Sequence, residues 1–306
     1  MTMFKVSICI CTRNRPDELD RALESISRST IRVYETIVSD DSMNDETEVM
    51  VRSRYPQVKY TRGPRKGLGA NRNHAVQLAT GTHVLFMDDD VVLNETFLEK
   101  MRAYISNRPV AESVKLIVTG TEHHRGGRIS TPHEQSFLGF QKIDYQSDQG
   151  LRTVVINSTL FPISVFDHIL FDDQLVYGYD EVDIATRSSY GGYTIHFLKD
   201  AYNFHFPSQI NRDYYKPFTE ASRLYVTFKR YLYSERKIGK AVLFMILASA
   251  HNLAANVKRD ARSSIGNTWR TLGLAYGYLI NHMLARRRSA YSLQSNINSV
   301  KFKEHR

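Results

Sequence analysis

The sequence has little cysteine, and what it has is poorly placed for covalent or metal chemistry. Cys9 and Cys11 are the only two cysteines among 306 residues. Residues two apart on an extended strand face the same way, which does not favour a disulfide between them. No histidine pattern beside them completes a zinc site. We therefore expect two buried thiols in a reducing cytoplasm.

Long apolar runs are also missing. The run Phe4–Cys11 is short and leads into the polar residues 12–15, which is unlike a secretory signal. The run Ala241–Ala250 is shorter than the roughly 20 residues that a helix needs to cross a bilayer. The sequence thus predicts a cytoplasmic protein without a membrane span.

Charge is distributed unevenly along the chain, whose formal net charge is +9. Residues 215–306 carry 17 Lys and Arg against 4 Asp and Glu, a net of +13. Residues 1–214 carry 24 against 28, a net of −4. Such an asymmetry indicates an anionic partner for the last third, either a membrane surface, a lipid-linked phosphate or nucleic acid.

Strand and helix patterns alternate through the first two thirds of the chain. Apolar, β-branched stretches such as Phe4–Cys11 and Val84–Met87 predict strands, and Pro16–Ser27 predicts a helix with proline in its first turn. This alternation predicts an α/β fold, a mostly parallel sheet with helices on both faces. Beyond Tyr214 the spacing is helical. We predict an α/β catalytic domain over 1–214 and a basic, mainly helical region over 215–306.

Residues 121–150 are polar and weakly periodic. Unstructured loops of this length are uncommon in a compact domain and are usually functional. We therefore expect a long loop beside the site.

Polar clusters follow three of the predicted strands. They are Thr12-Arg13-Asn14, Asp40-Asp41-Ser42 and Asp88-Asp89-Asp90. Parallel α/β sheets bind ligands at the carboxyl ends of their strands. The three clusters are therefore expected to line one crevice.

The aspartate triplet is the strongest chemical signal. Adjacent carboxylates repel one another unless a cation is near. On an extended chain Asp88 and Asp90 face the same way and Asp89 faces away. Oxygen ligands suit Mg²⁺ or Mn²⁺, either of which can bridge a nucleotide diphosphate. The alternative is an acidic turn on the surface.

Asp40 and Arg72 each admit two interpretations. Asp40 could accept a hydrogen bond from a nucleobase, whereas Ser42 with Asp45 fits a helix capping box. Arg72 could contact a phosphate or order the acidic cluster, and the alternative is a solvated arginine on a helix.

Two further positions could take part in chemistry. Asp180 and Asp183 fit a helix cap and its reciprocal acid, which leaves Glu181 available as a general base toward a hydroxyl. A capping role alone is the alternative. His205 lies among aromatic residues, as a core histidine would, and becomes a ligand where an oxygen-rich metal site lacks one.

Six segments of the chain keep the order and spacing of a known set of motifs. They are VSICICTRNRP (6–16), IVSDDS (37–42), GLGANRN (67–73), VLFMDDDV (84–91), GYDEVDIATR (178–187) and NFHF (203–206). Together they resemble glycosyltransferase family 2, the large inverting family with the GT-A fold. The resemblance covers about residues 4–206.

This resemblance implies a role for each matching residue. The implied nucleotide-binding residues are Thr12, Arg13, Asn14, Asp40, Arg72, Asp88 and Asp89. Asp40 would contact the uracil or thymine, and Asp88 the ribose or a water. Asp90 and His205 would hold Mn²⁺ or Mg²⁺. Glu181 matches the general base, with Asp180 as its rival, because Asp-Glu here replaces the family's usual Glu-Asp.

The implied activity is transfer of a sugar from a UDP- or dTDP-sugar, with inversion, to a hydroxyl of a glycan or lipid-linked acceptor. The resemblance points to cell-surface polysaccharide synthesis. The basic tail resembles C-terminal extensions of bacterial polysaccharide-building members. It would hold the enzyme on the cytoplasmic face of the inner membrane. The alternative is an ordinary helical subdomain that packs on the catalytic core or on a second subunit, in a homo-oligomer.

Three other classes remain as alternatives. A catalytically silent GT-A-like module would need a broken metal or base position, and both are filled. A basic protein that binds nucleic acid or another anionic surface would fit the charge, but no recognised motif supports a nucleic-acid partner. A sugar nucleotidyltransferase ordinarily has a glycine-rich loop after its first strand, and residues 12–16 contain no glycine.

Overall fold

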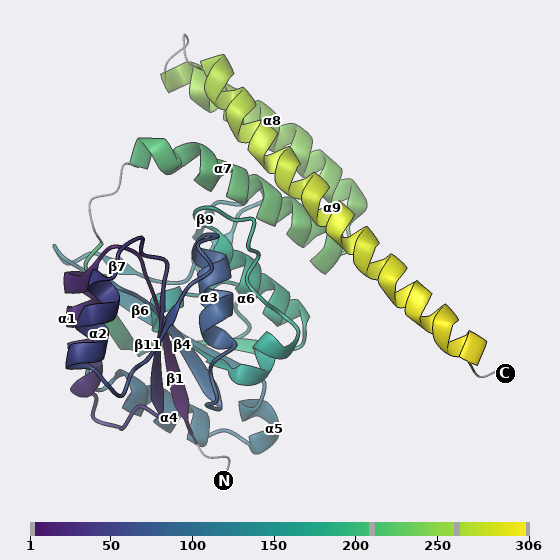
Figure 1. Cartoon of the computed structure of the whole chain (residues 1–306). Coiled ribbons are helices and arrows are strands. Elements are labelled where there is room, and N and C mark those ends of the chain that lie inside the picture. The colour runs from purple at the N-terminus through teal and green to yellow at the C-terminus, as the bar shows by residue number, and fades with distance from the viewer. Residues whose placement is uncertain (1–3, 208–211, 260–263, 304–306) are drawn as a thin grey trace. The chain divides into compact units, whose positions relative to one another are not determined.

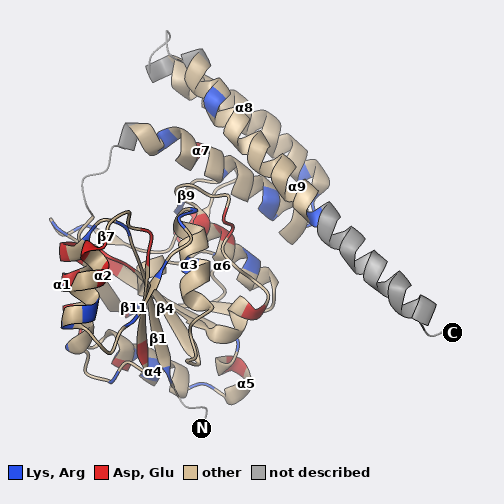
Figure 2. Ribbon diagram, in the orientation of Figure 1, with Lys and Arg blue, Asp and Glu red and all other residues tan. Residues whose placement is uncertain are grey.

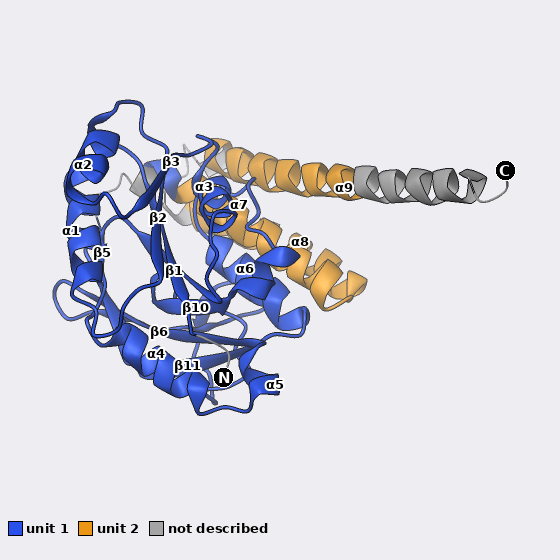
Figure 3. Ribbon diagram, turned by 60° about the horizontal axis from the view of Figure 1, so that its bottom comes forward, with its two compact units in different colours: residues 1–215 blue, residues 216–306 orange. Residues whose placement is uncertain are grey.

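The computed structural model describes the backbone of residues 4–207, 212–259 and 264–303 (Figure 1). Contacts divide the chain into two compact units, Met1–Tyr215 and Lys216–Arg306 (Figure 3). Both cysteines are free and buried.

The first unit is built on one large sheet. Its strands are β1 (Val6–Thr12), β2 (Glu35–Asp40), β3 (Lys59–Arg62), β4 (His83–Asp88), β5 (Val91–Val92), β6 (Leu116–His124), β7 (Ile129–Ser130), β10 (Thr159–Pro162) and β11 (Thr194–His205). Their order is β3-β2-β1-β4-β10-β6-β11-β5, and β7 pairs with β6 off this path. β1 to β4 are parallel, and β11 is parallel to β6. β10 and β5 run antiparallel to their neighbours.

Helices cover both faces of this sheet (Figure 1). They are α1 (Pro16–Ser27), α2 (Glu46–Arg54), α3 (Leu68–Val76), α4 (Phe97–Ser106), the short α5 (Val110–Ser113) and α6 (Asp180–Tyr190), with 3-10 turns at Ile156–Ser158 and Ile163–Asp167. One hydrophobic cluster joins α1, α2 and α4 to the sheet, and a second joins α3 and α6 to its other face. The predicted α/β fold, mostly parallel and covered on both sides, is confirmed.

Alternation along the strands explains the two clusters. Ile8 and Ile10 of β1 pack in the first cluster, whereas Cys9 between them packs in the second. Successive side chains of a strand point to opposite faces, so an unbroken apolar strand supplies both cores. The polar side chains of the three clusters therefore begin at the last residue of each strand.

The region expected to be a long loop is only partly one. β6 continues to His124, so residues 121–124 lie in the central sheet. The remainder carries β7 and a small second sheet of β8 (Glu134–Gln135) and β9 (Gln141–Ile143). The polarity of this segment masked its strands, because a strand that carries site residues at its end loses the apolar pattern on which the prediction depended.

The second unit is helical. It contains most of α7 (Arg212–Lys229), a π-helical turn (Arg230–Ser234), α8 (Ile238–Arg259) and α9 (Ser264–Lys303), of which α8 and α9 contact each other. Figure 2 marks lysine and arginine positions along these helices. By length and composition, Ile238–Val257 could cross a membrane, and 28% of this segment is buried. The prediction that no C-terminal segment is long enough was therefore wrong, because it counted only an uninterrupted apolar run. A single such helix is weak evidence, since helices packed inside proteins have the same length and composition.

Candidate functional site

The aspartate triplet forms the turn that carries the chain from β4 to β5. Asp88 ends β4, and its carboxylate accepts hydrogen bonds from Arg72 Nη2 at 2.9 Å and from Asn157 Nδ2 at 3.2 Å. The Asn157 Oδ1 atom accepts the Asp88 backbone N–H at 2.9 Å. Asp88 is thus held on two sides, with its side chain partly exposed.

Asp89 is the buried member of the triplet. Its two carboxylate oxygens accept hydrogen bonds from Thr12 Oγ1 at 2.8 Å and Arg15 Nη1 at 3.1 Å. Burial raises the pKa of Asp89 to about 6, against the opposing effect of Arg15. The hydrogen bond between Thr12 and Asp89 connects the end of β1 to the triplet.

Asp90 lies beside His205, which ends β11. The distance from Asp90 Oδ1 to His205 Nε2 is 3.2 Å. The backbone fixes this approach, because β5 pairs with β11 through Val91 and His205, and the Phe206 N–H donates to the Asp90 carbonyl at 2.9 Å. Burial lowers the pKa of His205, but hydrogen bonds to Asp90 and Glu122 outweigh it and raise that pKa to about 10.

The pair of Asp90 and His205 fits a divalent cation. Bonds of about 2.1 Å at right angles place two ligand atoms about 3 Å apart, close to the separation of Asp90 Oδ1 and His205 Nε2. A carboxylate oxygen with an imidazole nitrogen suits Mn²⁺. Both side chains are largely buried, at 9% and 19% exposure.

Arg72 joins the triplet to the start of α6. It lies on α3, is only 2% exposed, and bonds to Asp88 through Nη2 and to Asp180 through Nη1. The interpretation as a solvated arginine was wrong. Removing one partner of a buried ion pair typically costs about 3–5 kcal/mol. Arg72 therefore holds the two carboxylates firmly in place in this unit.

The amino-terminal end of α6 is set by an unusual backbone. Gly178 and Tyr179 both have positive φ, 76° and 65°, and Tyr179 is the N-cap residue without a side-chain cap. Asp180 is the first helical residue and pairs with Arg72, while Asp183 pairs with Arg187. The predicted capping role of Asp180 and Asp183 was therefore wrong, because both carboxylates bind arginines.

Glu181 differs from its neighbour Asp180. It accepts a 3.3 Å hydrogen bond from Gln141 Nε2, a neutral donor. Burial, followed by the nearby charge of Asp180, raises the pKa of Glu181 well above the usual carboxylate range. A carboxylate with a raised pKa is a stronger base once it is ionised.

Hydrogen bonds join the segments that follow β1 and β2. Asn14 has a φ of 56°, which asparagine tolerates, and its backbone N–H donates to Ser42 Oγ at 2.7 Å. Asp40 is 1% exposed and accepts bonds from the Ser42 N–H and the Tyr60 hydroxyl. Arg13 is exposed. The three predicted clusters thus meet, through the bonds of Thr12 to Asp89 and of Asn14 to Ser42.

The capping box proposed for Ser42 and Asp45 was wrong. The N-cap of α2 is Asp45, with no side-chain cap bond, and Ser42 lies outside the helix. Its hydroxyl instead accepts the Asn14 N–H, so it joins two loops.

Three residues of the site were missed by the sequence argument. Arg15 contacts Asp89 and Asp90, Asn157 holds Asp88, and Glu122 contacts His205. Arg15 could have been noticed from its place beside a polar strand end. Asn157 and Glu122 carry no local signal, because their roles depend on strand order.

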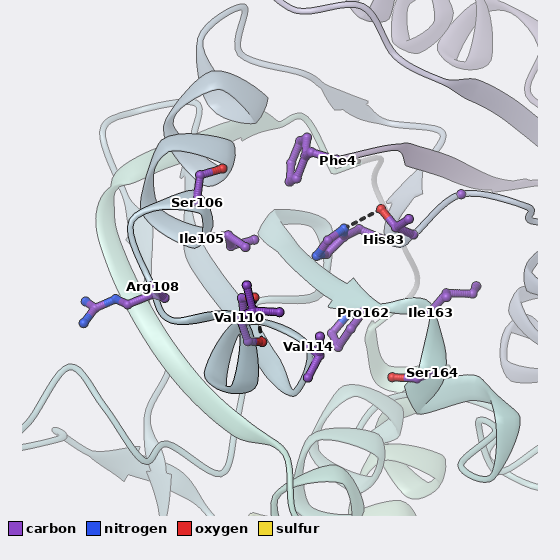
Figure 4. A pocket seen from close by; sticks show the side chains of 13 residues that line it. Phe4, His83, Ile105, Ser106, Arg108, Val110, Val114, Pro162, Ile163 and Ser164 are labelled. Carbon is purple, nitrogen blue, oxygen red and sulfur yellow. Dashed lines mark hydrogen bonds between the residues drawn. The ribbon is translucent and has the colours of Figure 1, made fainter. Parts of the chain in front are cut away.

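An apolar cavity of about 410 Å³ lies near the start of β4, at the opposite end of this strand from the triplet (Figure 4). Its lining includes Phe4, His83 and Ile163, around the start of β4, whereas the triplet follows the end of β4. Burial lowers the pKa of His83 to about 4, so this imidazole is neutral near pH 7. The cavity is thus separate from the acidic site.

Residues 7–170, more than half of the chain, match the family described as Glycosyl transferase family 2. The chain belongs to this family. The resemblance seen in the six sequence motifs is confirmed, and the protein is a glycosyltransferase.

Two curated relatives of this family 2 glycosyltransferase illustrate the range of similarity. The uncharacterized glycosyltransferase YwdF of Bacillus subtilis is 30% identical over 189 residues, which are 61% of this chain and 68% of YwdF. The GalNAc(5)-diNAcBac-PP-undecaprenol beta-1,3-glucosyltransferase of Campylobacter jejuni is 33% identical over 93 residues. That match covers 29% of this chain and only 30% of the Campylobacter protein.

Solved structures show the same fold. Residues 1–349 of S. aureus TarS, in complex with UDP-GlcNAc, superpose with a TM-score of 0.53 at 14% identity. The match covers 90% of this chain and 92% of the TarS chain. At this identity the likeness extends to the fold of the glycosyltransferase and no further.

Proposed function

We propose that this glycosyltransferase transfers a sugar, with inversion, from a UDP- or dTDP-sugar to a hydroxyl of a glycan or lipid-linked acceptor. One observation carries the proposal. Buried Arg72 bonds to Asp88 on the candidate donor side and to Asp180, the neighbour of Glu181, on the candidate acceptor side. A single residue thereby couples a cation-binding turn to a potential base.

Glu181 is the proposed general base, in preference to Asp180. The Asp180 carboxylate is held in an ion pair by the buried Arg72 guanidinium, so its oxygens are less available to an acceptor hydroxyl. Glu181 has a raised pKa, and its carboxylate accepts a hydrogen bond from the neutral amide of Gln141. In the reaction Glu181 takes the proton of the acceptor hydroxyl. The acceptor oxygen forms a bond to the anomeric carbon as the bond from that carbon to the diphosphate oxygen breaks.

Asp90 and His205 are the proposed ligands of the divalent cation. When bound, Mn²⁺ or Mg²⁺ would offset negative charge on the leaving diphosphate. Asp89 would keep the turn in place through Thr12 and Arg15, and Asp88 would contact the ribose or a water.

The proposed nucleotide-binding residues at the ends of β1 and β2 are Thr12, Arg13, Asn14 and Asp40. Support comes from the bonds that unite the ends of β1 and β2 and from the UDP-GlcNAc complex of TarS, which has the same fold. Asp40 already accepts from Tyr60. A uracil or thymine N–H would therefore share or replace that hydroxyl at the Asp40 carboxylate.

The proposed activity is tested with a panel of UDP- and dTDP-sugars, with and without Mn²⁺. We expect at least one donor to raise the melting temperature only with the metal, because both bind the folded state. The same donor should be consumed with inversion when a glycan or undecaprenyl-diphosphate-linked saccharide is supplied. Metal-independent binding, or a product with retained anomeric configuration, would contradict the proposal.

For the second unit we propose attachment to an anionic membrane surface. Exposed apolar side chains recur along α8; they are Ile238, Val242, Leu243, Ile246, Leu247, Leu253 and Val257. The basic excess of this region would add about 1 kcal/mol per residue near an anionic bilayer. A homo-oligomer formed through the same face is the competing proposal, and the Campylobacter relative named for an undecaprenol-linked substrate favours the membrane.

Sedimentation with vesicles distinguishes these two. We expect the protein to bind phosphatidylglycerol vesicles and the double variant Ile246→Ser/Leu247→Ser to bind at least tenfold more weakly. Each buried aliphatic side chain contributes about 1.5–3 kcal/mol. The matched control is Val110→Ser, an exposed valine of the first unit. Equal sedimentation with and without vesicles, together with a dimer in solution, would favour the oligomer.

A further inference from the structure

We propose that Glu122 is a positioning residue for His205. Its carboxylate accepts a hydrogen bond from Nδ1–H of the imidazole and so keeps the Nε2 lone pair directed at the cation held with Asp90. The inference rests on the metal site of the proposed function and assigns a role to a residue outside the recognised motifs.

The two ring nitrogens of His205 face different carboxylates. The Nδ1 atom lies 2.8 Å from Glu122 Oε2, and Nε2 lies 3.2 Å from Asp90 Oδ1. A neutral imidazole carries a proton on one nitrogen and a lone pair on the other. A cation that binds beside Asp90 would displace the Nε2 proton of the charged ring. The proton that stays on Nδ1 then donates to Glu122, and the Nε2 lone pair faces the Asp90 side. Histidines that bind metals commonly donate their other N–H to a carboxylate in this way.

The backbone places Glu122 where this contact forms. β6 and β11 run parallel, with Glu122 opposite Asn203 and His124 opposite His205. Residues two apart on a strand share a face, so Glu122 and His205 lie diagonally on one side of the sheet. Glu122 is buried, and the β6–β7 pairing with Ser130 covers its strand.

Glu122 and His205 could instead belong to a separate cation site. Ligand atoms of Glu122, His124 and His205 lie within 4.8 Å of one another, close enough to hold a cation of their own. The existing bonds favour the positioning role, because His124 Nε2 already pairs with Ser130 Oγ at 2.7 Å and lies 3.9 Å from Glu122 Oε2. The Glu122 carboxylate is much closer to His205. A separate cation site would need both short contacts to break.

The test measures Mn²⁺ binding in the presence of UDP, by the electron paramagnetic resonance signal of free Mn²⁺. We expect one Mn²⁺ per chain for the wild type. Glu122→Ala should weaken its affinity about 10- to 100-fold, as loss of an outer carboxylate partner commonly does. Glu122→Gln should lose less, because its amide oxygen still accepts from Nδ1–H, and it serves if the alanine variant fails to fold.

A double-mutant cycle separates positioning from a general effect on the fold. Because Glu122 acts through His205, Glu122→Ala should cost little further Mn²⁺ affinity in a His205→Ala background. Glu35→Ala is the matched control. Like Glu122, Glu35 has an 8% exposed, hydrogen-bonded side chain, but it begins β2, which lies next to the edge strand β3 on the other side of the sheet from β6 and β11. Its removal should lower stability and leave Mn²⁺ affinity unchanged.

Several results would overturn the inference. Unchanged Mn²⁺ affinity in Glu122→Ala, or an equal loss with and without His205, would show that Glu122 does not act through the imidazole. Two Mn²⁺ per wild-type chain, with one lost in Glu122→Ala, would make Glu122 a ligand of a separate cation. UDP binding that needs no Mn²⁺ in the wild type would instead remove the proposed metal site itself.

Discussion

Replacing Asp90 with alanine is expected to abolish both sugar transfer and Mn²⁺-dependent binding of UDP. Asp90 supplies the carboxylate that approaches His205 Nε2 at 3.2 Å, whereas the adjacent Asp89 is already bound by Thr12 and Arg15. A single imidazole is a poor site for Mn²⁺, which prefers oxygen ligands. Turnover and calorimetric titration of UDP with and without Mn²⁺ measure the two effects.

The control for this variant is an exposed carboxylate at the opposite ends of the strands. Glu112 serves because it lies on α5, beside the cavity at the start of β4. Glu112→Ala should retain turnover within about twofold, as surface substitutions usually do. If Asp90→Ala still binds UDP in a Mn²⁺-dependent manner, Asp90 is not a ligand of the metal.

The second large effect is expected at Glu181. The Glu181→Gln variant should bind the donor normally but lose about 10²- to 10⁴-fold in kcat, the usual contribution of a general base. Only the ionised form accepts a proton. Because burial raises the pKa of Glu181, wild-type kcat/KM should increase with pH across that raised pKa, while the residual rate of the variant should not.

The pH profile also tests the rival base. Asp180→Asn removes a partner of buried Arg72, so a lower melting temperature and a lower rate are both expected from disturbed geometry. What distinguishes the base is the pH dependence. If Asp180→Asn abolishes the rise with pH and Glu181→Gln keeps it, the assignment is reversed.

The raised pKa of Glu181 should also make the stability of the protein depend on pH. Its pKa in the folded state is raised, so the protonated form is the one that folding favours. Its contribution is fully present below the unfolded pKa of about 4.3 and is lost as pH rises through the folded pKa. The difference in melting temperature, Glu181→Gln minus wild type, should therefore become more positive as pH increases. A constant difference would mean that Glu181 titrates normally.

The fold class could be predicted from the sequence because the strands are apolar and the segments between them are polar. Pro16–Ser27, for example, is a helix over the predicted range, since proline and a strong apolar periodicity mark the same boundaries. The same logic failed where strands become polar. β6 was taken as loop beyond residue 120, because Thr121 and Glu122 interrupt the apolar pattern.

The candidate site shows the same division. Local patterns identified the triplet, Glu181 and His205 as chemically notable. They could not show that Arg72 is buried between two carboxylates or that Glu122 contacts His205, because these contacts join positions 108 and 83 residues apart. Helix caps were assigned wrongly at Ser42 and Asp180, since tertiary bonds to Asn14 and Arg72 took the groups that a cap would use.

The pairing of β5 with β11 also has a consequence for the order of folding. β5 is two residues long and lies at the edge of the sheet, and β11 reaches it only near the end of the first unit. Bringing β5 and β11 together closes a long loop of the chain between them. Closing such a loop costs conformational entropy before the contact can form. We therefore expect the contact between Asp90 and His205 to form after the more local pairing of β1 to β4. A nascent chain that ends at residue 170, where the family match stops, lacks both His205 and Glu181.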